Sequence, residues 1–191
     1  MAEYRLRSAS IEDARSIAEI HAKAWRETYL GVMRGEALAS IDLDDWTRRW
    51  RERIGSSEGA EAVFIACEGE SPVGFARCSP LTNSKLVPLG FEGEIASIYL
   101  LRRAQRRGLG RRLVERLAEH LISAGCASAA VWVLRDSPKA RGFYEALGAE
   151  PVGVEGVWDT EGVVLPDIAY GWRDLHALCS GAGAVTRSPI R

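Results

Sequence analysis

The chain has 191 residues, of which 47% are hydrophobic and 27% charged, a composition typical of a single globular domain with a sizeable core. Its 25 basic and 26 acidic residues leave a net charge of −1, which disfavours a nucleic-acid or membrane-surface partner. The four cysteines and three histidines lack metal-ligand spacing, and no apolar run reaches the roughly 20 residues of a membrane span, so we expect no metal site, no membrane partner and a reducing, cytoplasmic setting.

The first part of the chain predicts a strand and two amphipathic helices. Residues 4–7 alternate apolar and charged side chains, and residues 10–13 form a capping-box pattern that opens a helix. We interpret His21, on the apolar stripe of that helix, as a packed core histidine. A second helix is predicted over residues 43–54. Four aromatic side chains leave two interpretations open, core packing or the lining of an acceptor pocket: Trp25, Tyr29, Trp46 and Trp50.

Three strands are predicted in the middle of the chain. Residues 62–67 and 72–78 form a hairpin around a turn, and residues 79–90, with two prolines, form an irregular loop of the kind often found near sites. Residues 94–100 are apolar or small on nearly both faces, which predicts a buried central strand.

An arginine-rich turn follows the central strand and leads into a helix that opens at Gly108. Amide groups at a helix N-terminus lack intrahelical partners and favour an anion, and glycines at 108 and 110 would let a ligand approach the backbone. Leu113 stands where a dinucleotide-binding motif needs glycine, and no Lys-Ser or Lys-Thr completes a Walker loop. Six arginines between Arg102 and Arg112 fit a pocket for a phosphorylated small molecule better than a DNA groove.

The last part of the chain predicts a strand, a helix and a hairpin. Residues 127–134 form the strand, and Ser137-Pro138 caps a helix that ends at Gly148. Residues 152–158 and 163–170 form the hairpin. We expect residues 1–173 to make one domain and residues 174–191 to be a disordered tail.

Two segments resemble the motifs of one family, the GCN5-related N-acetyltransferases (GNAT). Gln105-Arg106-Arg107-Gly108-Leu109-Gly110 resembles the Q/R-x-x-G-x-G/A motif, and residues 134–148, LRDSPKARGFYEALG, resemble the segment V-x-x-x-N-x-x-A-x-x-F-Y-x-x-x-G. The motifs stand in the family's order, and the resemblance covers roughly residues 4–172. Ser137 replaces the family's usual Asn and Ala149 its usual Phe, which puts the Asn-mediated cofactor contact in doubt.

The resemblance implies an α/β fold, a central mixed β-sheet with helices on both faces, and acetyl-CoA as the co-substrate. Tyr144 takes the place of the family's general acid, with packing beside Phe143 as its alternative role. The amides of residues 106–111 would hold the pyrophosphate, and the backbone of residues 98–100 would pair with the pantetheine arm. The implied cofactor-binding residues are Ile98, Tyr99, Leu100, Gln105, Arg106, Arg107, Gly108, Leu109, Gly110, Arg111, Ser137 and Tyr144.

Glu94 is the candidate base, and a role in binding a cationic acceptor is equally open; Glu92 is a weaker substitute. Strand alternation puts Glu94 on one face with Ala96, Ile98 and Leu100. Without a visible Ser-His-Asp or Cys-His arrangement, we expect direct attack by the amine rather than a covalent enzyme intermediate.

The acceptor is expected to be a primary amine of a small molecule: polyamine-like, an antibiotic or an amino-acid derivative. The stretch AWRETYLG resembles family members that acetylate small amines, and the predicted acceptor-binding residues are Trp25, Tyr29 and Glu94. The alternatives are a non-catalytic acyl-CoA sensor and a protein N-terminal or lysine acetyltransferase. The expected assembly is a monomer or homodimer.

Overall fold

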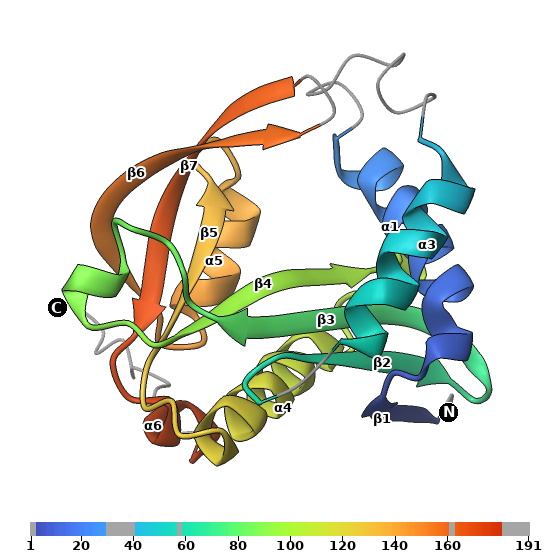
Figure 1. Ribbon diagram of the computed structural model, residues 1–191, viewed down its shortest axis with the longest axis horizontal. Helices are drawn as coiled ribbons and strands as arrows, with labels where there is room; N and C mark the ends of the chain where they lie inside the picture. The colour runs from blue at the N-terminus through green and yellow to red at the C-terminus, as the bar shows by residue number, and fades with distance from the viewer. Residues whose placement is uncertain (1–2, 30–40, 57–58, 161–162, 181–191) are drawn as a thin grey trace, which may run out of the picture.

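A computed structural model of the protein describes residues 3–29, 41–56, 59–160 and 163–180. Within these ranges a seven-stranded sheet has the order β1-β2-β3-β4-β5-β7-β6 (Figure 1). Neighbouring strands are antiparallel except β4 and β5, which are parallel, so the sheet is mixed as predicted. The strands are β1 (Tyr4–Ser8), β2 (Ala62–Glu68), β3 (Ser71–Pro80), β4 (Gly93–Leu100), β5 (Ala129–Leu134), β6 (Glu150–Thr160) and β7 (Val163–Trp172).

Helices cover both faces of the sheet, as predicted (Figure 1). One face carries α1 (Ala14–Tyr29) and α3 (Leu43–Gly55), and the other carries α4 (Leu109–Ser123), α5 (Pro138–Glu145) and α6 (Leu175–Cys179). The described short 3-10 turns are η1 (Ile11–Asp13), η2 (Val87–Leu89) and η3 (Arg102–Ala104). None of the described helices is long and apolar enough to cross a lipid bilayer.

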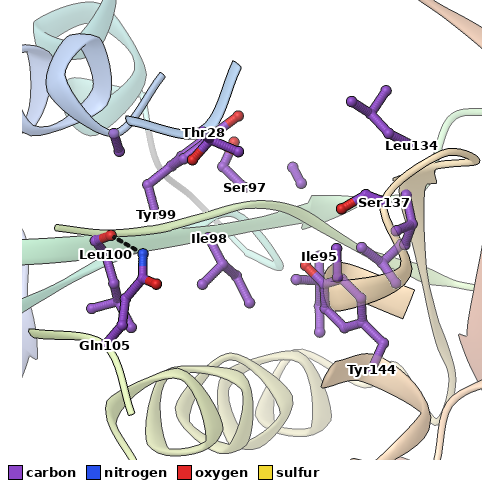
Figure 2. Close-up of a pocket in the computed structure, with 15 residues that line it drawn as sticks. Thr28, Ile95, Ser97, Ile98, Tyr99, Leu100, Gln105, Leu134, Ser137 and Tyr144 are labelled. Carbon is purple, nitrogen blue, oxygen red and sulfur yellow. Dashed lines mark hydrogen bonds between the residues drawn. The ribbon is translucent and has the colours of Figure 1, made fainter. Parts of the chain in front are cut away.

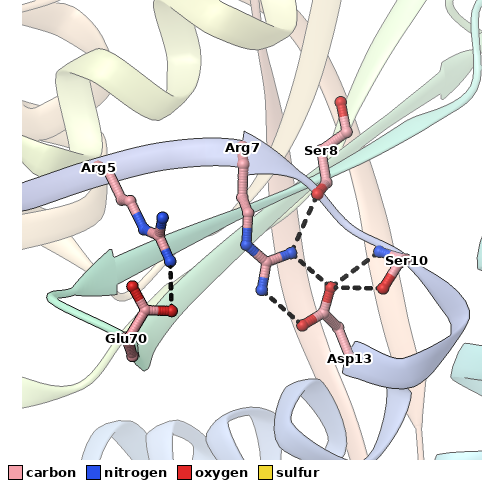
Figure 3. Close-up of polar contacts among 6 residues, drawn as sticks. All are labelled: Arg5, Arg7, Ser8, Ser10, Asp13 and Glu70. Carbon is pink, nitrogen blue, oxygen red and sulfur yellow. Dashed lines mark hydrogen bonds and ion pairs between the residues drawn. The ribbon is translucent and has the colours of Figure 1, made fainter.

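The predicted capping box lies in η1, directly before α1 (Figure 3). The Asp13 carboxylate accepts the Ser10 backbone N–H at 2.8 Å and two guanidinium N–H groups of Arg7 at 2.6 and 2.8 Å. These bonds, led by those from Arg7, lower the pKa of Asp13. Strand β1 is therefore tied to the start of α1 through one half-buried ion pair.

The aromatic residues of α1 and α3 form part of the core on the first face. Trp25, Trp46 and Trp50 are 4%, 6% and 2% exposed, and their ring centroids lie 5.2, 4.4 and 5.8 Å from that of His21. The core-packing interpretation therefore holds for these three tryptophans, and His21 is a core histidine as predicted. The side chain of Tyr29 lies outside the described part of the structure.

The second face is built on α4, whose apolar stripe packs on the sheet as predicted: Leu109, Leu113, Val114, Leu117 and Leu121 are all buried. The expected tail over residues 174–191 is wrong at its start, because residues 175–179 form α6. Asp174 caps this helix, and Leu175 and Leu178 are buried in the same core as α4. A helix of five residues is too short to show a 3.6-residue period. Residues 181–191 lie outside the described residues.

Candidate active site

The candidate site lies where β4 and β5 separate. The two strands pair only at Gly93–Ala129 and Glu94–Ala130, whereas β3 stays paired with β4 as far as Leu100. Beyond Glu94 a cavity of about 210 Å³ occupies the space between the diverging strands (Figure 2). Its lining comes from β4, β5, α1 and α5 and from Gln105.

A β-bulge in β4 sets which side chains reach each side of this cavity. On β3, Arg77 stands opposite Ser97 and Cys78 opposite Ile95, so Ala96 is an extra residue in β4. Ile95 and Ile98 point toward α4, whereas Ser97 and Tyr99 point toward α1 (Figure 2). All four side chains line the cavity, which therefore passes through the sheet from one face to the other.

Because of this bulge, the predicted orientation of Glu94 is wrong. Glu94 pairs with Ser79 and shares the α1 face with Ser97, whereas Ile98 and Leu100 face α4. Regular alternation fails because the extra residue shifts the pattern by one position. Glu94 holds the last paired position before the strands part, and burial raises its pKa, an effect that Arg77 partly offsets.

Glu92, the weaker candidate base, has a structural contact. Its Oε2 accepts the backbone N–H of Ala127 at 2.6 Å, which ties the residue before β4 to the loop before β5. Glu94 is thus the better placed carboxylate of the two.

The predicted anion-binding turn lies at the N-terminus of α4. Gly108 is the N-cap residue with φ +77°, and the space where a Cβ would stand is open. Arg106, two residues before Gly108, also has a positive φ, +61°, a conformation that costs energy for a residue other than glycine. The first amides of α4 have no partners within the helix, so this turn is suited to bind a phosphate group.

The six arginines of this region fall into two groups. Four contact protein groups: Arg102 with Glu27, Arg103 with Glu68, Arg111 with Ala146 and Glu115, and Arg112 with Tyr4. Arg106 and Arg107 are exposed, and neither forms an ion pair with a described residue. These two guanidinium groups remain for an anionic ligand.

Two other predicted contacts of this segment differ from expectation. An added Cβ at Gly110 would lie 3.0 Å from the Phe143 ring, so this glycine permits close packing of α4 on α5 rather than the approach of a ligand. Leu109 is buried in the core, which leaves only its backbone for a ligand.

Gln105 joins the two sides of the cavity. Its side-chain amide donates to the Leu100 carbonyl at 3.0 Å (Figure 2). Its side-chain carbonyl accepts from Lys139 Nζ at 3.0 Å. The end of β4 is thereby linked to α5. Gln105, Ile98, Tyr99 and Leu100 all line the cavity.

Tyr144 of helix α5 and Ser137, the residue before this helix, both line the cavity (Figure 2). Ser137 and Pro138 are the N-cap and first helical residues as predicted, but the Ser137 side chain makes no capping hydrogen bond. The Tyr144 ring packs 5.0 Å from Phe143 and 6.0 Å from Trp172 while its side chain lines the cavity. Tyr144 thus combines the packing role with exposure to the cavity.

Sequence reasoning missed the contributions of Ala24, Thr28 and Ser97. They line the cavity on the α1 side, whereas the predicted acceptor residue Trp25 is buried against Trp158, with ring centroids 5.2 Å apart. Ala24 and Thr28 are four residues apart on one helix, so their spacing could have identified this pair.

Comparisons with known structures identify the same fold. The N-acetyltransferase PaiA from Thermoplasma acidophilum in complex with coenzyme A is 20% identical and matches with a TM-score of 0.67 over 87% of this chain and 98% of its own. YncA from Salmonella typhimurium with its cofactor acetyl-CoA is 17% identical, with a TM-score of 0.66 over 91% of this chain and 95% of its own.

Sequence comparisons establish the family. An uncharacterized N-acetyltransferase of Bacillus subtilis, YuaI, is 34% identical over 174 residues, which cover 91% of this chain and 95% of that protein. Residues 15–149 match the acetyltransferase (GNAT) family. The resemblance of the two motifs is therefore confirmed, and the chain belongs to the GNAT acetyltransferase family.

Proposed function

We propose that the protein transfers the acetyl group of acetyl-CoA to a primary amine of a small molecule. The observation that carries the proposal is the cavity between β4 and β5, which is lined by Tyr144 of α5 and by Gln105, three residues before the α4 N-cap residue Gly108. Relatives of the same fold hold coenzyme A or acetyl-CoA. The four cysteines are free, which agrees with a reducing, cytoplasmic setting.

The residues around the cavity fit acetyl-CoA as co-substrate. The α4 N-terminus with Arg106 and Arg107 would bind its phosphates, and the edge of β4 over residues 98–100 would bind its pantetheine arm. The bound co-substrate supplies a thioester, which makes the acetyl group reactive toward an amine.

The proposed chemistry needs one base and one acid. Glu94 takes a proton from the acceptor ammonium, and the free amine then forms the N–C bond as the C–S bond breaks. Tyr144 gives its phenol proton to the departing sulfur, and the second proton that the nitrogen loses on becoming an amide restores the phenol. Burial raises the pKa of Glu94 toward neutral pH, and a pKa near the working pH suits a general base.

The test is the release of free thiol from acetyl-CoA across a panel of amines. Tyr144→Phe should lower kcat about 100-fold or more while acetyl-CoA still binds, because the variant keeps the ring and loses only the acid. Tyr170→Phe is the matched control. The Tyr170 hydroxyl donates a hydrogen bond to Glu145 Oε1 at 2.7 Å, and Tyr170 does not line the cavity. Equal kcat in Tyr144→Phe and wild type would refute the acid role.

The role of Glu94 is decided by Glu94→Gln. If Glu94 is the base, kcat falls about 100-fold and the acidic limb of the pH–rate profile disappears. In wild type that limb should lie above the ordinary glutamate pKa, because burial raises the pKa of Glu94, and activity should fall as the pH drops through it. A rise in KM with unchanged kcat would instead assign Glu94 to acceptor binding.

The same assays separate the alternatives. Tight binding of acetyl-CoA without thiol release from any amine would favour a non-catalytic sensor. Release with peptides but with none of the small amines would favour a protein acetyltransferase.

A further inference from the structure

Arg77 of β3 takes part in a half-buried ion pair on the α1 side of the sheet, the side that Glu94 faces. Its Nε and Nη2 donate to Oε1 of Glu61, the residue before β2, at 3.0 and 2.9 Å. The side chains of Arg77 and Glu61 are 21% and 22% exposed. Solvent therefore screens the charge of Arg77 less than that of an arginine on the open surface.

The sheet register places Arg77 next to Glu94 as well. Glu94 stands directly opposite Ser79 of β3, and Arg77 is two residues before Ser79, so the two charged side chains leave the same face. Diagonal neighbours of this kind lie roughly 7–8 Å apart, a distance that a long side chain can span. Arg77 also stands opposite Ser97, which lines the cavity. Its guanidinium group thus has one carboxylate on the β2 side, Glu61, and another on the β4 side, Glu94.

The carboxylate of Glu94 forms no hydrogen bond or ion pair with a described residue. Burial raises its pKa, and the positive charge of Arg77 opposes this rise. Charges on the neighbouring elements act elsewhere: Arg53 of α3 acts on Arg77, and Lys85 before η2 acts on Asp167 of β7, which is buried. Arg77 is therefore the charge that decides at which pH Glu94 can accept a proton.

We propose that Arg77 is a positioning residue for the base: Glu61 anchors its guanidinium group, and its charge keeps Glu94 ionised at neutral pH. Burial favours the neutral carboxylic acid, whereas a general base must be ionised before it can take a proton from the acceptor. Arg77 acts through Glu94, since it does not itself line the cavity. Glu61 shares the same guanidinium group and so limits the positive charge that Glu94 experiences. This inference rests on the proposed acetyl transfer.

The two partners of the ion pair allow a test with opposite expected results. Arg77→Gln removes the positive charge, so the acidic limb of the kcat/KM profile should move up by about one pH unit, and the rate below the limb should fall about tenfold. Glu61→Gln leaves the charge of Arg77 to Glu94 alone, so the limb should move down. Both variants break the same ion pair, and a merely structural role would therefore move both profiles alike. Movement of both limbs in one direction would overturn the proposal.

Two further variants serve as controls. Arg77→Lys keeps the positive charge and should return the acidic limb close to its wild-type pH; a limb that stays as high as in Arg77→Gln would overturn the role of the charge. Arg5→Gln breaks the exposed Arg5–Glu70 pair on β1 and should leave the profile unchanged. Thermal unfolding of each variant checks that it is folded.

The titration of Glu94 itself separates this inference from the proposed function. Carbon-13 NMR of the side-chain carboxyl groups follows this residue without any substrate, and Glu94→Gln identifies its signal. A pKa of Glu94 that is higher in Arg77→Gln and lower in Glu61→Gln would support the role of Arg77 even if no amine is acetylated, an outcome that overturns only the transferase. A titration of Glu94 that is the same in both variants as in wild type would overturn the role of Arg77, and thiol release would still decide the transferase.

Discussion

The imidazole of His21 is enclosed by aromatic rings that include Tyr99, a cavity residue, at a centroid distance of 4.6 Å. Its Nδ1 is buried without a hydrogen bond from any described residue, and burial lowers the pKa of His21 to about 3. The folded protein therefore keeps this ring neutral under conditions that would charge it in the unfolded chain, whose histidines titrate near 6.5.

This difference makes stability depend on pH. The unfolded chain binds a proton at His21 below about pH 6.5 and the folded protein does not, so acid favours unfolding. The free energy of unfolding should not depend on the His21 proton above about pH 6.5. Below that pH it should fall by up to about 1.4 kcal/mol per pH unit. Urea denaturation between pH 7 and 5 should show this slope in wild type and a flatter one in His21→Phe. His176→Gln, a change of an exposed histidine, should keep the wild-type slope.

Arg106 and Arg107 allow a direct test of the phosphate contacts. Arg106→Gln and Arg107→Gln should each weaken coenzyme A binding by about tenfold, because a guanidinium–phosphate contact is lost at a partly exposed site. Neither change should alter the affinity for pantetheine, which lacks the phosphates. Titration calorimetry with both ligands measures the difference. Arg103→Gln is the control, since Arg103 pairs with Glu68 at 2.6 Å; a loss of affinity as large as that of Arg107→Gln would contradict the division of the arginines.

At the scale of elements, β1 offers two ion pairs that differ in burial (Figure 3). Arg7 and Asp13 have side chains 37% and 11% exposed, whereas Arg5 and Glu70 are 49% and 89% exposed. Arg7→Gln should cost about 2 kcal/mol of unfolding free energy, since it leaves a mostly buried carboxylate without its partner at the start of α1. Arg5→Gln should cost about 0.5 kcal/mol or less. Equal effects in urea denaturation would contradict this ranking.

Acid weakens the Arg7–Asp13 pair as well, but for a different reason: an ion pair lowers the pKa of Asp13, whereas burial lowers the pKa of His21. Pairing lowers the pKa of Asp13 below its unfolded value near 3.9, so the contribution is present above about pH 4 and is lost as acid protonates the folded carboxylate. The difference between wild type and Arg7→Gln should therefore stay constant between pH 7 and 5 and shrink only in urea denaturation extended below about pH 4.

For the whole molecule, the periodicities of the sequence predict most of the architecture. The apolar stretch at residues 94–100 and the stripe of α4 predicted a central strand and its covering helix, because periods of 2 and 3.6 are local properties of the chain. Two short motifs directed attention to Gln105, Ser137 and Tyr144, which the fold brings to one cavity although they come from two separate segments.

What the sequence could not reveal depends on pairing between distant residues. The bulge at Ala96 exists only relative to the register of β3, and the burial of Asp167 only relative to β5 and β6. The division of the arginines depends on Glu27 and Glu68, which lie 75 and 35 residues away from Arg102 and Arg103 along the chain. No local pattern encodes such partners.

The extra residue at Ala96 has a consequence for how this protein can change in evolution. Point substitutions along β4 adjust the two mouths of the cavity one side chain at a time. The gain or loss of a single codon beside Ala96 would instead exchange the side chains offered to the two faces, because a slip of one residue turns every following side chain over. Divergence to new acceptors should therefore proceed by replacement within β4 at constant length, with insertions and deletions confined to the connecting loops.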